Sequence, residues 1–407
     1  MEQYDVVLFG ATSFVGAILT SYMLEKYPVE GDLKWAIAGR SESKLAQLKT
    51  SCGAAAMSLP CIVADADDKA SIDALVGSTK VIISTVGPYA LYGEPVIKSC
   101  VAQGTDYCDL TGEPQWIKKM IDRYEDLAKI SGARIVHSCG FDSIPSDLGV
   151  YFLQEKAKER FGQYCCSVKM RVKTIKGAAS GGTVASMMNM IKEATKDREL
   201  RKLLVNPYAL CPSTHPFKSK QTDLKTLAYD KDMQAWVAPF VMAAINIRIV
   251  HRTNSLLGNQ YGEDFLYDEA MITGKSILGG ISAAAFSAGM GGFMLAAAIP
   301  PSRWLMEKTI LPKPGEGPSP KAQLEGHYDL RFVGKTHNGQ EIRCKVTGDR
   351  DPGYGSTAKM LGQSAVCLVE DITKEDKIGG FWTPASIFGD KIIDRLEKHA
   401  GLIFSEE

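Results

Sequence analysis

The chain lacks an excess of charge of either sign. Lys and Arg together number 47, and Asp and Glu also number 47, so the formal net charge is zero. A balanced chain offers no electrostatic footprint for the phosphates of a nucleic acid, and we predict no nucleic-acid partner. With 45% hydrophobic and 23% charged residues, the composition is that of a folded globular protein rather than a disordered one.

Paired cysteine motifs are also missing. None of the ten cysteines lies in a Cys-x-x-Cys pair, and the six histidines are not spaced to join them as zinc ligands. We therefore predict no metal site and a reduced, cytoplasmic protein. The beginning of the chain shows no apolar signal-peptide segment, because polar residues 2–5 lead directly into a strand-like run.

A glycine-bounded turn follows that first apolar run. Residues 5–10 read DVVLFG, the pattern of a buried parallel strand, and a helix-like stretch begins after Gly16. A strand, turn and helix in this order direct unpaired backbone N–H groups at the pyrophosphate of a dinucleotide. The pattern predicts a cofactor cradle made of Gly10, Thr12, Ser13, Phe14, Val15 and Gly16.

Strands continue to alternate with helices as far as residue 150. Further strands fit residues 33–38, 61–64, 81–85, 106–110 and 134–138. This alternation predicts an α/β fold, with a doubly wound parallel sheet of Rossmann type over residues 1–150. Because ligands bind beyond the carboxyl ends of such strands, we add Asp65, Gly87 and Pro88 to the predicted cofactor site.

The end of the second strand favours NADP(H) over NAD(H) as the cofactor. Units that bind NAD usually place Asp or Glu at this point to accept hydrogen bonds from the ribose. This chain instead has Arg40, followed by Ser41. A guanidinium can pair with a 2′-phosphate through charge-assisted hydrogen bonds. The alternative is a solvated Arg at a strand end.

The hydrophobic period changes after residue 150. Segments 167–175, 245–251, 328–335 and 340–346 alternate like half-exposed strands, and a helix is expected from Gly182 to about residue 194. We predict a second, α+β domain over residues 151–350, built on a mainly antiparallel sheet for substrate binding or for assembly into a homodimer. Residues 351–407, with a helix at 353–370, are expected to return to the first domain.

Residues 276–302 carry no charge. This segment is long enough to cross a bilayer, although it consists mostly of Ala, Gly and Ser. Gly289, Gly291 and Gly292 interrupt its centre and favour two short helices in a hairpin. Three placements stay open: peripheral contact with a membrane or lipid surface, a buried or subunit-facing helix pair, and a single membrane span.

Six segments resemble the saccharopine dehydrogenase-like oxidoreductases. They read GATSFVG, AGRS, GPYALYGEPVIKSC, DLTGEP, SCGFDSIPSDLG and GGFWTPASIFGDKIIDRLEKHAG, and they extend from one end of the chain to the other. The branch that the chain resembles most includes animal members and the bacterial trans-acting enoyl reductases. The resemblance implies a Rossmann domain, NADP(H) as cofactor and oxidoreductase activity. Ser13 departs from it, because the family commonly carries Gly there.

Hydride transfer also requires a group that supplies or removes a proton near the nicotinamide. The polar candidates in the strand-end loops are Tyr89, Tyr92, Glu113, His137, Cys139, Asp142 and Asp147. We select Tyr89, followed by Glu113 and Asp142, as catalytic residues. Capping a helix or filling the core is the alternative role for each, and His137 fits the core. Asp109 is expected to bind backbone N–H groups at a strand end.

Together these patterns predict an NADPH-dependent reductase of an apolar carbonyl or enoyl substrate, as found in lipid metabolism. Two other hypotheses stay open. One is a non-catalytic nucleotide-binding protein that associates with lipid surfaces. The other is an amino-acid dehydrogenase of the saccharopine type, which needs basic residues that converge on substrate carboxylates.

Overall fold

The computed structural model describes residues 3–177, 181–222, 224–309, 311 and 317–407, and the chain divides into two compact units. The first unit contains Met1–Ile144 and Gly353–Gly401. The second contains Pro145–Pro314, Pro318–Pro352 and Leu402–Glu407. The segment predicted as one piece over residues 351–407 is therefore divided between the two units.

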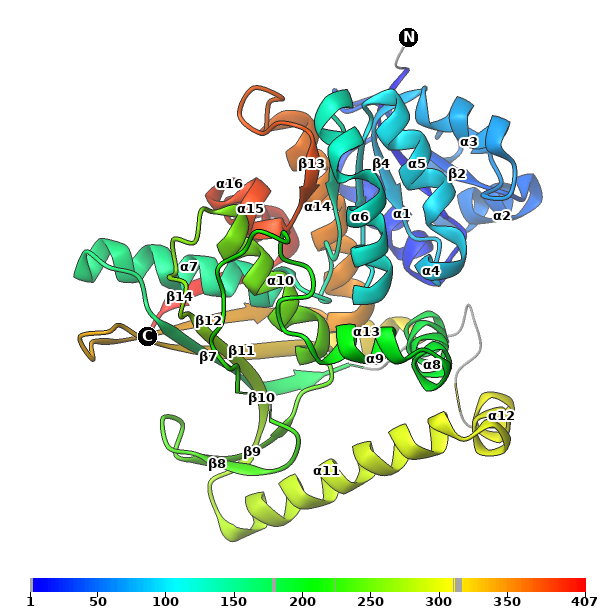
Figure 1. Cartoon of the computed structure of the whole chain (residues 1–407). Coiled ribbons are helices and arrows are strands. Elements are labelled where there is room, and N and C mark those ends of the chain that lie inside the picture. Colours follow the sequence, from blue (N-terminus) through cyan, green and yellow to red (C-terminus); the bar gives the residue numbers. More distant parts are fainter. Residues whose placement is uncertain (1–2, 178–180, 223, 310, 312–316) are drawn as a thin grey trace. The chain divides into compact units, whose positions relative to one another are not determined.

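The first unit is a parallel sheet covered by helices (Figure 1). Its strands are β1 (Tyr4–Phe9), β2 (Trp35–Gly39), β3 (Cys61–Val63), β4 (Thr79–Ser84), β5 (Asp106–Asp109), β6 (Arg134–Val136) and β13 (Gly380–Trp382). Its helices are α1 (Phe14–Lys26), α2 (Glu42–Cys52), α3 (Lys69–Val76), α4 (Tyr89–Tyr92), α5 (Glu94–Gln103), α6 (Pro114–Ser131), α14 (Thr357–Glu370), α15 (Pro384–Phe388) and α16 (Asp390–Arg395).

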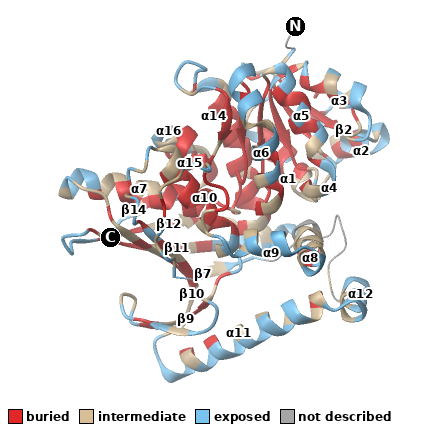
Figure 2. Cartoon of the chain, viewed as in Figure 1, coloured by how far each residue is buried: buried red, intermediate tan, exposed pale blue. Residues whose placement is uncertain are grey.

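The strand order is β13-β6-β5-β4-β1-β2-β3, and all neighbours are parallel. From β3 to β6 this is the Rossmann order, and the predicted fold class is confirmed. The central strands are continuous apolar runs because both faces of the sheet are covered, and Figure 2 shows them as buried.

Helix α14 completes the first unit from far along the chain. It packs on α1 and on strands β1, β4 and β5. Gly362 permits this approach, since a Cβ there would lie 3.0 Å from Leu19 Cδ1. Gln363 then joins the two helices, because its Nε2 donates to Tyr22 Oη over 2.7 Å. The sheet is thus covered partly by residues more than 300 positions later in the chain.

The second unit is built on a mixed sheet. Its strands are β7 (Ser167–Lys176), β8 (Ala228–Asp230), β9 (Ala235–Pro239), β10 (Leu266–Gly274), β11 (His327–Lys335), β12 (Glu341–Gly348) and β14 (Leu402–Glu406). Its helices are α7 (Ile144–Phe161), α8 (Gly181–Lys196), α9 (Arg198–Val205), α10 (Ala243–Leu256), α11 (Ile277–Ala298), α12 (Pro300–Thr309) and α13 (Pro320–Glu325).

The order of this sheet is β14-β12-β11-β7-β10-β9-β8. Only β7 and β10 pair in parallel, so the sheet is mainly antiparallel, as predicted. Helix α7 lies close against β11, because a Cβ at Gly149 would stand 2.3 Å from the Phe332 ring. The two glycines of this contact, Gly149 and Gly334, leave room for Phe332 and Leu153.

The strand predicted at residues 245–251 is wrong, because these residues belong to helix α10. Ile245 and Ile249 satisfy both an alternating and a helical period over so short a stretch. The polar residues of the run, Asn246, Arg248 and His251, are also buried, so their alternation does not mark a solvent face. Because the helix is buried on all sides, the alternation of polar and apolar residues does not separate an exposed face from a buried one, and it therefore did not indicate a half-exposed strand.

The hairpin predicted within residues 276–302 is also wrong. Helix α11 runs without a break through Gly289, Gly291 and Gly292. Each glycine costs a helix about 1 kcal/mol relative to Ala, and the surrounding Ala, Leu and Met residues favour the helix enough to continue it. A Cβ at any of these three glycines would meet no atom within 4 Å.

Helix α11 is supported at its two ends and bare between them. Near its start, Gly279 approaches Gly274 of β10 and Gly280 approaches Trp236 of β9. Near its end, Ala297 joins a small apolar cluster with residues of α8. By length and composition α11 is long and apolar enough to cross a membrane. Only 11% of its most apolar stretch is buried, and Figure 2 shows most of the helix as exposed.

Candidate active site

The glycines at the two ends of the β1–α1 turn bring the backbone close to the strands. Gly10 has φ +88°, a conformation that L side chains rarely adopt, and a Cβ there would lie 2.7 Å from Val86 Cγ2. A Cβ at Gly16 would lie 2.3 Å from the carbonyl oxygen of Gly10. Both positions therefore exclude a side chain, as a close pyrophosphate cradle requires.

Ser13 replaces the usual glycine by acting as the N-cap of α1. Its φ of −70° needs no glycine, and its Oγ accepts a hydrogen bond from Gly16 N over 3.0 Å. Since α1 begins at Phe14, the amides of Phe14 and Val15 have no acceptor within the helix. These two N–H groups remain available to an anion at the N-terminus of α1. The chain thus fits a dinucleotide despite its departure from the family pattern.

A positively charged side chain, Arg40, lies at the end of the predicted cofactor site formed by β2. Arg40 directly follows β2 and is exposed, and within the described ranges no ion pair or hydrogen bond is found for its guanidinium. Thr12 lies near the residue before it, since its Oγ1 is 3.8 Å from the Cβ position of Gly39. Ser41 caps α2 by accepting from Lys44 N at 3.4 Å. This edge can receive a 2′-phosphate.

Asp65 follows β3 at the carboxyl edge of the same sheet. Its Oδ1 accepts a hydrogen bond from Asp67 N at 3.2 Å, and its own N–H donates to Ser71 Oγ. The side chain therefore holds a turn at the strand end. The structure leaves Asp65 partly exposed, at the edge where a cofactor lies in this fold.

Tyr89 and Glu113 anchor the loop after β4, which contains the cis peptide Gly87–Pro88. Tyr89 is buried, its Oη donates to the carbonyl of Ser84 over 2.9 Å, and burial raises its pKa well above the usual range. The two carboxylate oxygens of Glu113 accept from Tyr89 N and Ala90 N, each at 2.9 Å. Both side chains are thus engaged with backbone groups rather than with open space.

Asp142 is the selected candidate whose carboxyl group suits proton transfer. It lies in the loop after β6, with Oδ1 3.2 Å from the Cβ position of Gly112 and Oδ2 3.1 Å from that of Gly140. Burial raises the pKa of Asp142 to about 7, and the negative charge of Asp109 adds to the effect. The residue keeps some solvent exposure. An acid that titrates near neutral pH can both donate and accept a proton there.

The remaining candidates are engaged elsewhere. Cys139 is buried with its thiol pKa well above the ordinary value because of that burial. Tyr92 is 42% exposed on α4. Asp147 belongs to the second unit, where its Oδ1 accepts from Thr253 Oγ1 over 2.6 Å. His137 lies in the core with Nδ1 2.7 Å from Asp109 Oδ2.

The structure adds residues that the sequence did not indicate. Thr85 accepts a hydrogen bond from Ser13 Oγ, and Thr357 of α14 accepts from Phe141 N over 2.9 Å. Ser138 has φ +60°, which is unusual for a residue other than glycine. Thr85 directly precedes the VGP motif and could have been included with it. Thr357 is separated from Phe141 by 216 positions, and no local pattern connects them.

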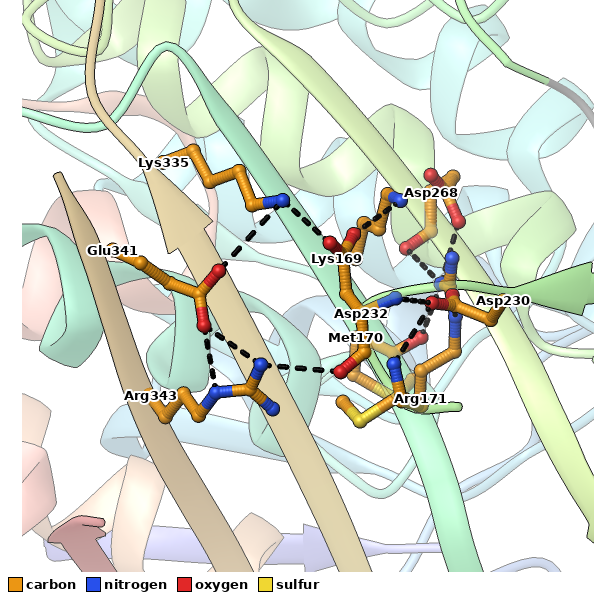
Figure 3. A network of polar contacts seen from close by, with 10 residues as sticks. Lys169, Met170, Arg171, Asp230, Asp232, Asp268, Lys335, Glu341 and Arg343 are labelled. Carbon is orange, nitrogen blue, oxygen red and sulfur yellow. Dashed lines mark hydrogen bonds and ion pairs between the residues drawn. The ribbon is translucent and has the colours of Figure 1, made fainter. Parts of the chain in front are cut away.

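Three basic residues on the sheet of the second unit form ion pairs with acids. Lys169 and Lys335 pair with Asp232, and Arg171 lies between Asp230 and Asp268 (Figure 3). These cations do not form a free cluster for substrate carboxylates, as the amino-acid dehydrogenase hypothesis requires. Among the residues that the structure describes, no group of three or more His, Cys, Asp or Glu side chains is placed to hold a metal ion.

Known proteins are similar to this chain both in the first unit and over nearly its whole length. Residues 6–136 match the saccharopine dehydrogenase NADP binding domain. A relative from Mycobacterium tuberculosis, named provisionally as a trans-acting enoyl reductase, is 38% identical over 405 residues, which cover 97% of this chain and 96% of the relative. The trans-acting enoyl reductase of Mycobacterium bovis is 36% identical over 407 residues, with the same coverage.

The fold is similar to that of an experimentally determined structure. Apo saccharopine dehydrogenase (L-Glu forming) from Saccharomyces cerevisiae superposes with a TM-score of 0.56 at 14% sequence identity. The match covers 99% of both chains. At this level of identity the similarity concerns the fold alone.

Proposed function

The chain belongs to the family of saccharopine dehydrogenase-like, NADP-dependent oxidoreductases that includes the trans-acting enoyl reductases, and we propose that it reduces the carbon–carbon double bond of an apolar enoyl substrate with NADPH. The relatives named enoyl reductases are similar along the entire chain, including the second unit. The single structural observation that carries the proposal is the position of the Asp142 carboxyl group, with Oδ1 3.2 Å from the Cβ position of Gly112, where burial raises its pKa to about 7.

Different residues of the first unit would bind different parts of the cofactor. The N–H groups of Phe14 and Val15 would bind the pyrophosphate, and Arg40 with Thr12 and Ser41 would bind the 2′-phosphate. The loop that contains Gly87 and Pro88 borders the nicotinamide end. When bound, NADPH would supply a hydride for the β-carbon of a double bond conjugated to a carbonyl.

Asp142 completes the reduction by donating a proton. Addition of hydride at the β-carbon leaves negative charge on the enolate, and a proton from the Asp142 carboxyl group to the α-carbon yields the saturated product. Asp142 then regains a proton from solvent. A group whose pKa lies near the working pH carries out both steps at a useful rate. Tyr89 and Glu113 support the loop beside this site rather than exchange protons.

The exposed apolar side chains of helix α11 are an argument for an apolar substrate. They also favour peripheral contact with a lipid surface in the cytoplasm. These exposed side chains include Ile277 at 82%, Leu278 at 72% and Leu295 at 65% exposure, and residues 276–302 carry no charge. An exposed apolar surface of this kind usually contacts a membrane, a ligand or another protein. Lipid contact would place the enzyme where long-chain enoyl substrates are concentrated. A second copy of this chain is the competing partner for the same surface.

The proposal is tested with the full chain, NADPH and 2-enoyl thioesters of increasing acyl length. We expect loss of NADPH absorbance and formation of the saturated acyl product, with higher kcat/KM for longer chains. Asp142→Asn should retain NADPH binding and lose most turnover. Tight NADPH binding with no product from any enoyl substrate would favour the non-catalytic hypothesis. Oxidation of saccharopine with NADP⁺ would favour the amino-acid dehydrogenase.

A further inference from the structure

Buried carboxylates join the strand-end loops of β4, β5 and β6 to one another. Glu113, from the loop after β5, accepts from the amides of Tyr89 and Ala90 at the start of α4, directly after the β4 loop. Asp109, at the end of β5, makes the corresponding bridge toward the loop after β6. Each carboxylate thus replaces water as the partner of backbone N–H groups that have no strand neighbour.

Asp109 is fully buried and uses both carboxylate oxygens. Its Oδ1 accepts from Thr111 N at 3.0 Å and from Ser138 N at 3.2 Å, so one atom bridges two loops. Its Oδ2 lies 2.7 Å from Nδ1 of His137, which is buried beside it. The backbone carbonyl of Asp109 also accepts from Cys139 N at 2.7 Å.

Ser138 strengthens the same junction in a conformation that needs support. Its φ of +60° is disfavoured for a residue with a side chain, and such strain persists only where surrounding contacts hold it. Here the Ser138 N–H is bound by Asp109, and the Ser138 Oγ donates to the carbonyl of Thr111 over 2.7 Å. The turn places the following residues, up to Asp142, across the loop that contains Gly112.

We propose that Asp109 is the positioning residue for proton transfer: its buried carboxylate fixes loop 137–143 to loop 110–113 and so holds Asp142 over Gly112. The inference rests on the proposed function, in which Asp142 is the proton donor. Asp109 itself, at 0% exposure, does not touch substrate. Its effect on the reaction passes through the place and the charge of Asp142.

The charge of Asp109 also acts on the pKa of Asp142, so the positioning role can be followed through that pKa. Burial is the main cause of the raised pKa of Asp142, and Asp109 is the nearby acid that raises it further. Tyr89 and Cys139 also interact with Asp142, and burial raises the pKa of each well above its usual value, so both stay neutral near pH 7. His137 is in contact with Asp109, and Glu113 lies in the loop that contains Gly112. Thr357, which approaches Gly140 from α14, does not titrate. Removing the charge of Asp109 therefore lowers the pKa of Asp142.

The test compares Asp109→Asn with Asp106→Asn in the full chain. Asparagine at 109 keeps an acceptor for the two amides but loses the charge. Asp106 is a matched control, because it is a buried acid on the same strand that binds Arg134 at the opposite end. Asp109→Ala removes the bridge itself. Ser138→Ala keeps the backbone N–H bound by Asp109 and removes only the second tie between the loops, from Ser138 Oγ to the carbonyl of Thr111, and it serves if the alanine at 109 does not fold.

Two measurements are made on each protein: the pH profile of kcat, and the pKa of Asp142 from carboxyl infrared bands identified with Asp142→Asn. We expect Asp109→Asn to lower the pKa of Asp142, to move the alkaline limb of the kcat profile to lower pH, and to leave the Kd of NADPH unchanged. Loss of the bridge should reduce kcat on the order of 10-fold, a part of what a positioned acid contributes, and increase amide exchange in loop 137–143.

The outcomes separate this inference from the proposed function. A lower Asp142 pKa and faster exchange in loop 137–143, in a protein that reduces no enoyl substrate, support the positioning role and reject the enoyl reductase. Normal turnover with an unchanged Asp142 pKa and unchanged exchange in the Asp109 variants overturns the positioning role. The same change of pH profile in Asp106→Asn also overturns it, because loss of stability alone would then be the cause.

Discussion

Ser13 Oγ donates a hydrogen bond to Thr85 Oγ1 over 3.0 Å, which joins the N-cap of α1 to the residue that follows β4. Thr85 Oγ1 in turn donates to the carbonyl of Gly10 over 2.8 Å. Two hydrogen bonds therefore connect the turn after β1 to the loop that contains Gly87 and Pro88. The serine that departs from the family pattern is part of this connection.

Ser13→Ala should weaken both stability and NADPH binding. The variant loses the N-cap, which typically costs about 1 kcal/mol, and it also loses the bond to Thr85. Ser13→Gly should cost only a few tenths of a kcal/mol in capping, since glycine is tolerated at this position. Denaturation midpoints and NADPH titrations of the two variants check this. An alanine variant as stable and as tight-binding as the wild type would contradict the connection.

Arg40→Ala should reduce the preference for NADPH over NADH. Hydrogen bonds to a charged group contribute roughly 1.5–3 kcal/mol, so the Kd of NADPH should rise about 10- to 100-fold while that of NADH stays nearly constant. The matched control is Arg123→Ala, which removes another exposed arginine from the first unit. Paired titrations with both nucleotides measure the ratio. Equal weakening of NADPH and NADH would place the 2′-phosphate elsewhere.

Asp142→Asn should stabilise the protein at alkaline pH. Because the folded-state pKa of about 7 lies above the ordinary value for Asp, the stability that depends on a protonated Asp142 is complete below about pH 4 and is lost as the pH rises to about 7. Asparagine carries no charge at any pH, so the difference in unfolding free energy should grow between these limits. Urea unfolding at pH 4 and pH 8 tests the sign. A difference that does not change with pH would contradict the raised pKa.

Charged substitutions on α11 should abolish contact with lipid. Ile281 is 60% exposed and Leu295 is 65% exposed, and a glutamate at either position makes insertion into an apolar layer unfavourable. Co-sedimentation with neutral phospholipid vesicles should fall for Ile281→Glu and Leu295→Glu. Ile130→Glu is the control, because Ile130 is 83% exposed but belongs to α6 of the first unit rather than to α11. A change in oligomeric state without any vesicle binding would instead identify a second copy of the chain as the partner.

Much of the first unit was predictable because its signals are local. The apolar runs of a covered parallel sheet, the Gly10 and Gly16 turn and the Arg40 position each depend on residues within one strand–turn–helix unit. Such a unit imposes the same backbone geometry wherever it occurs, so the fold class and the NADP(H) cofactor followed from the sequence.

The elements that the sequence described wrongly are those whose surroundings are supplied by distant parts of the chain. The period of residues 245–251 suits a strand as well as a helix, and only burial on every side selects α10. Likewise, no local pattern distinguishes a broken hairpin from the continuous α11, because its glycines are tolerated in a helix at moderate cost.

The chemistry of the site depended most on tertiary structure. The sequence by itself determined that Tyr89, Glu113 and Asp142 lie in strand-end loops of one sheet. Only the fold decided that Glu113 binds two amides and that Asp142 is buried near the charge of Asp109. Periodicity encodes the backbone and its burial, whereas hydrogen-bond partners and pKa values follow from atoms brought together across loops of β4, β5 and β6. That is why three candidates from neighbouring loops have different hydrogen-bond partners.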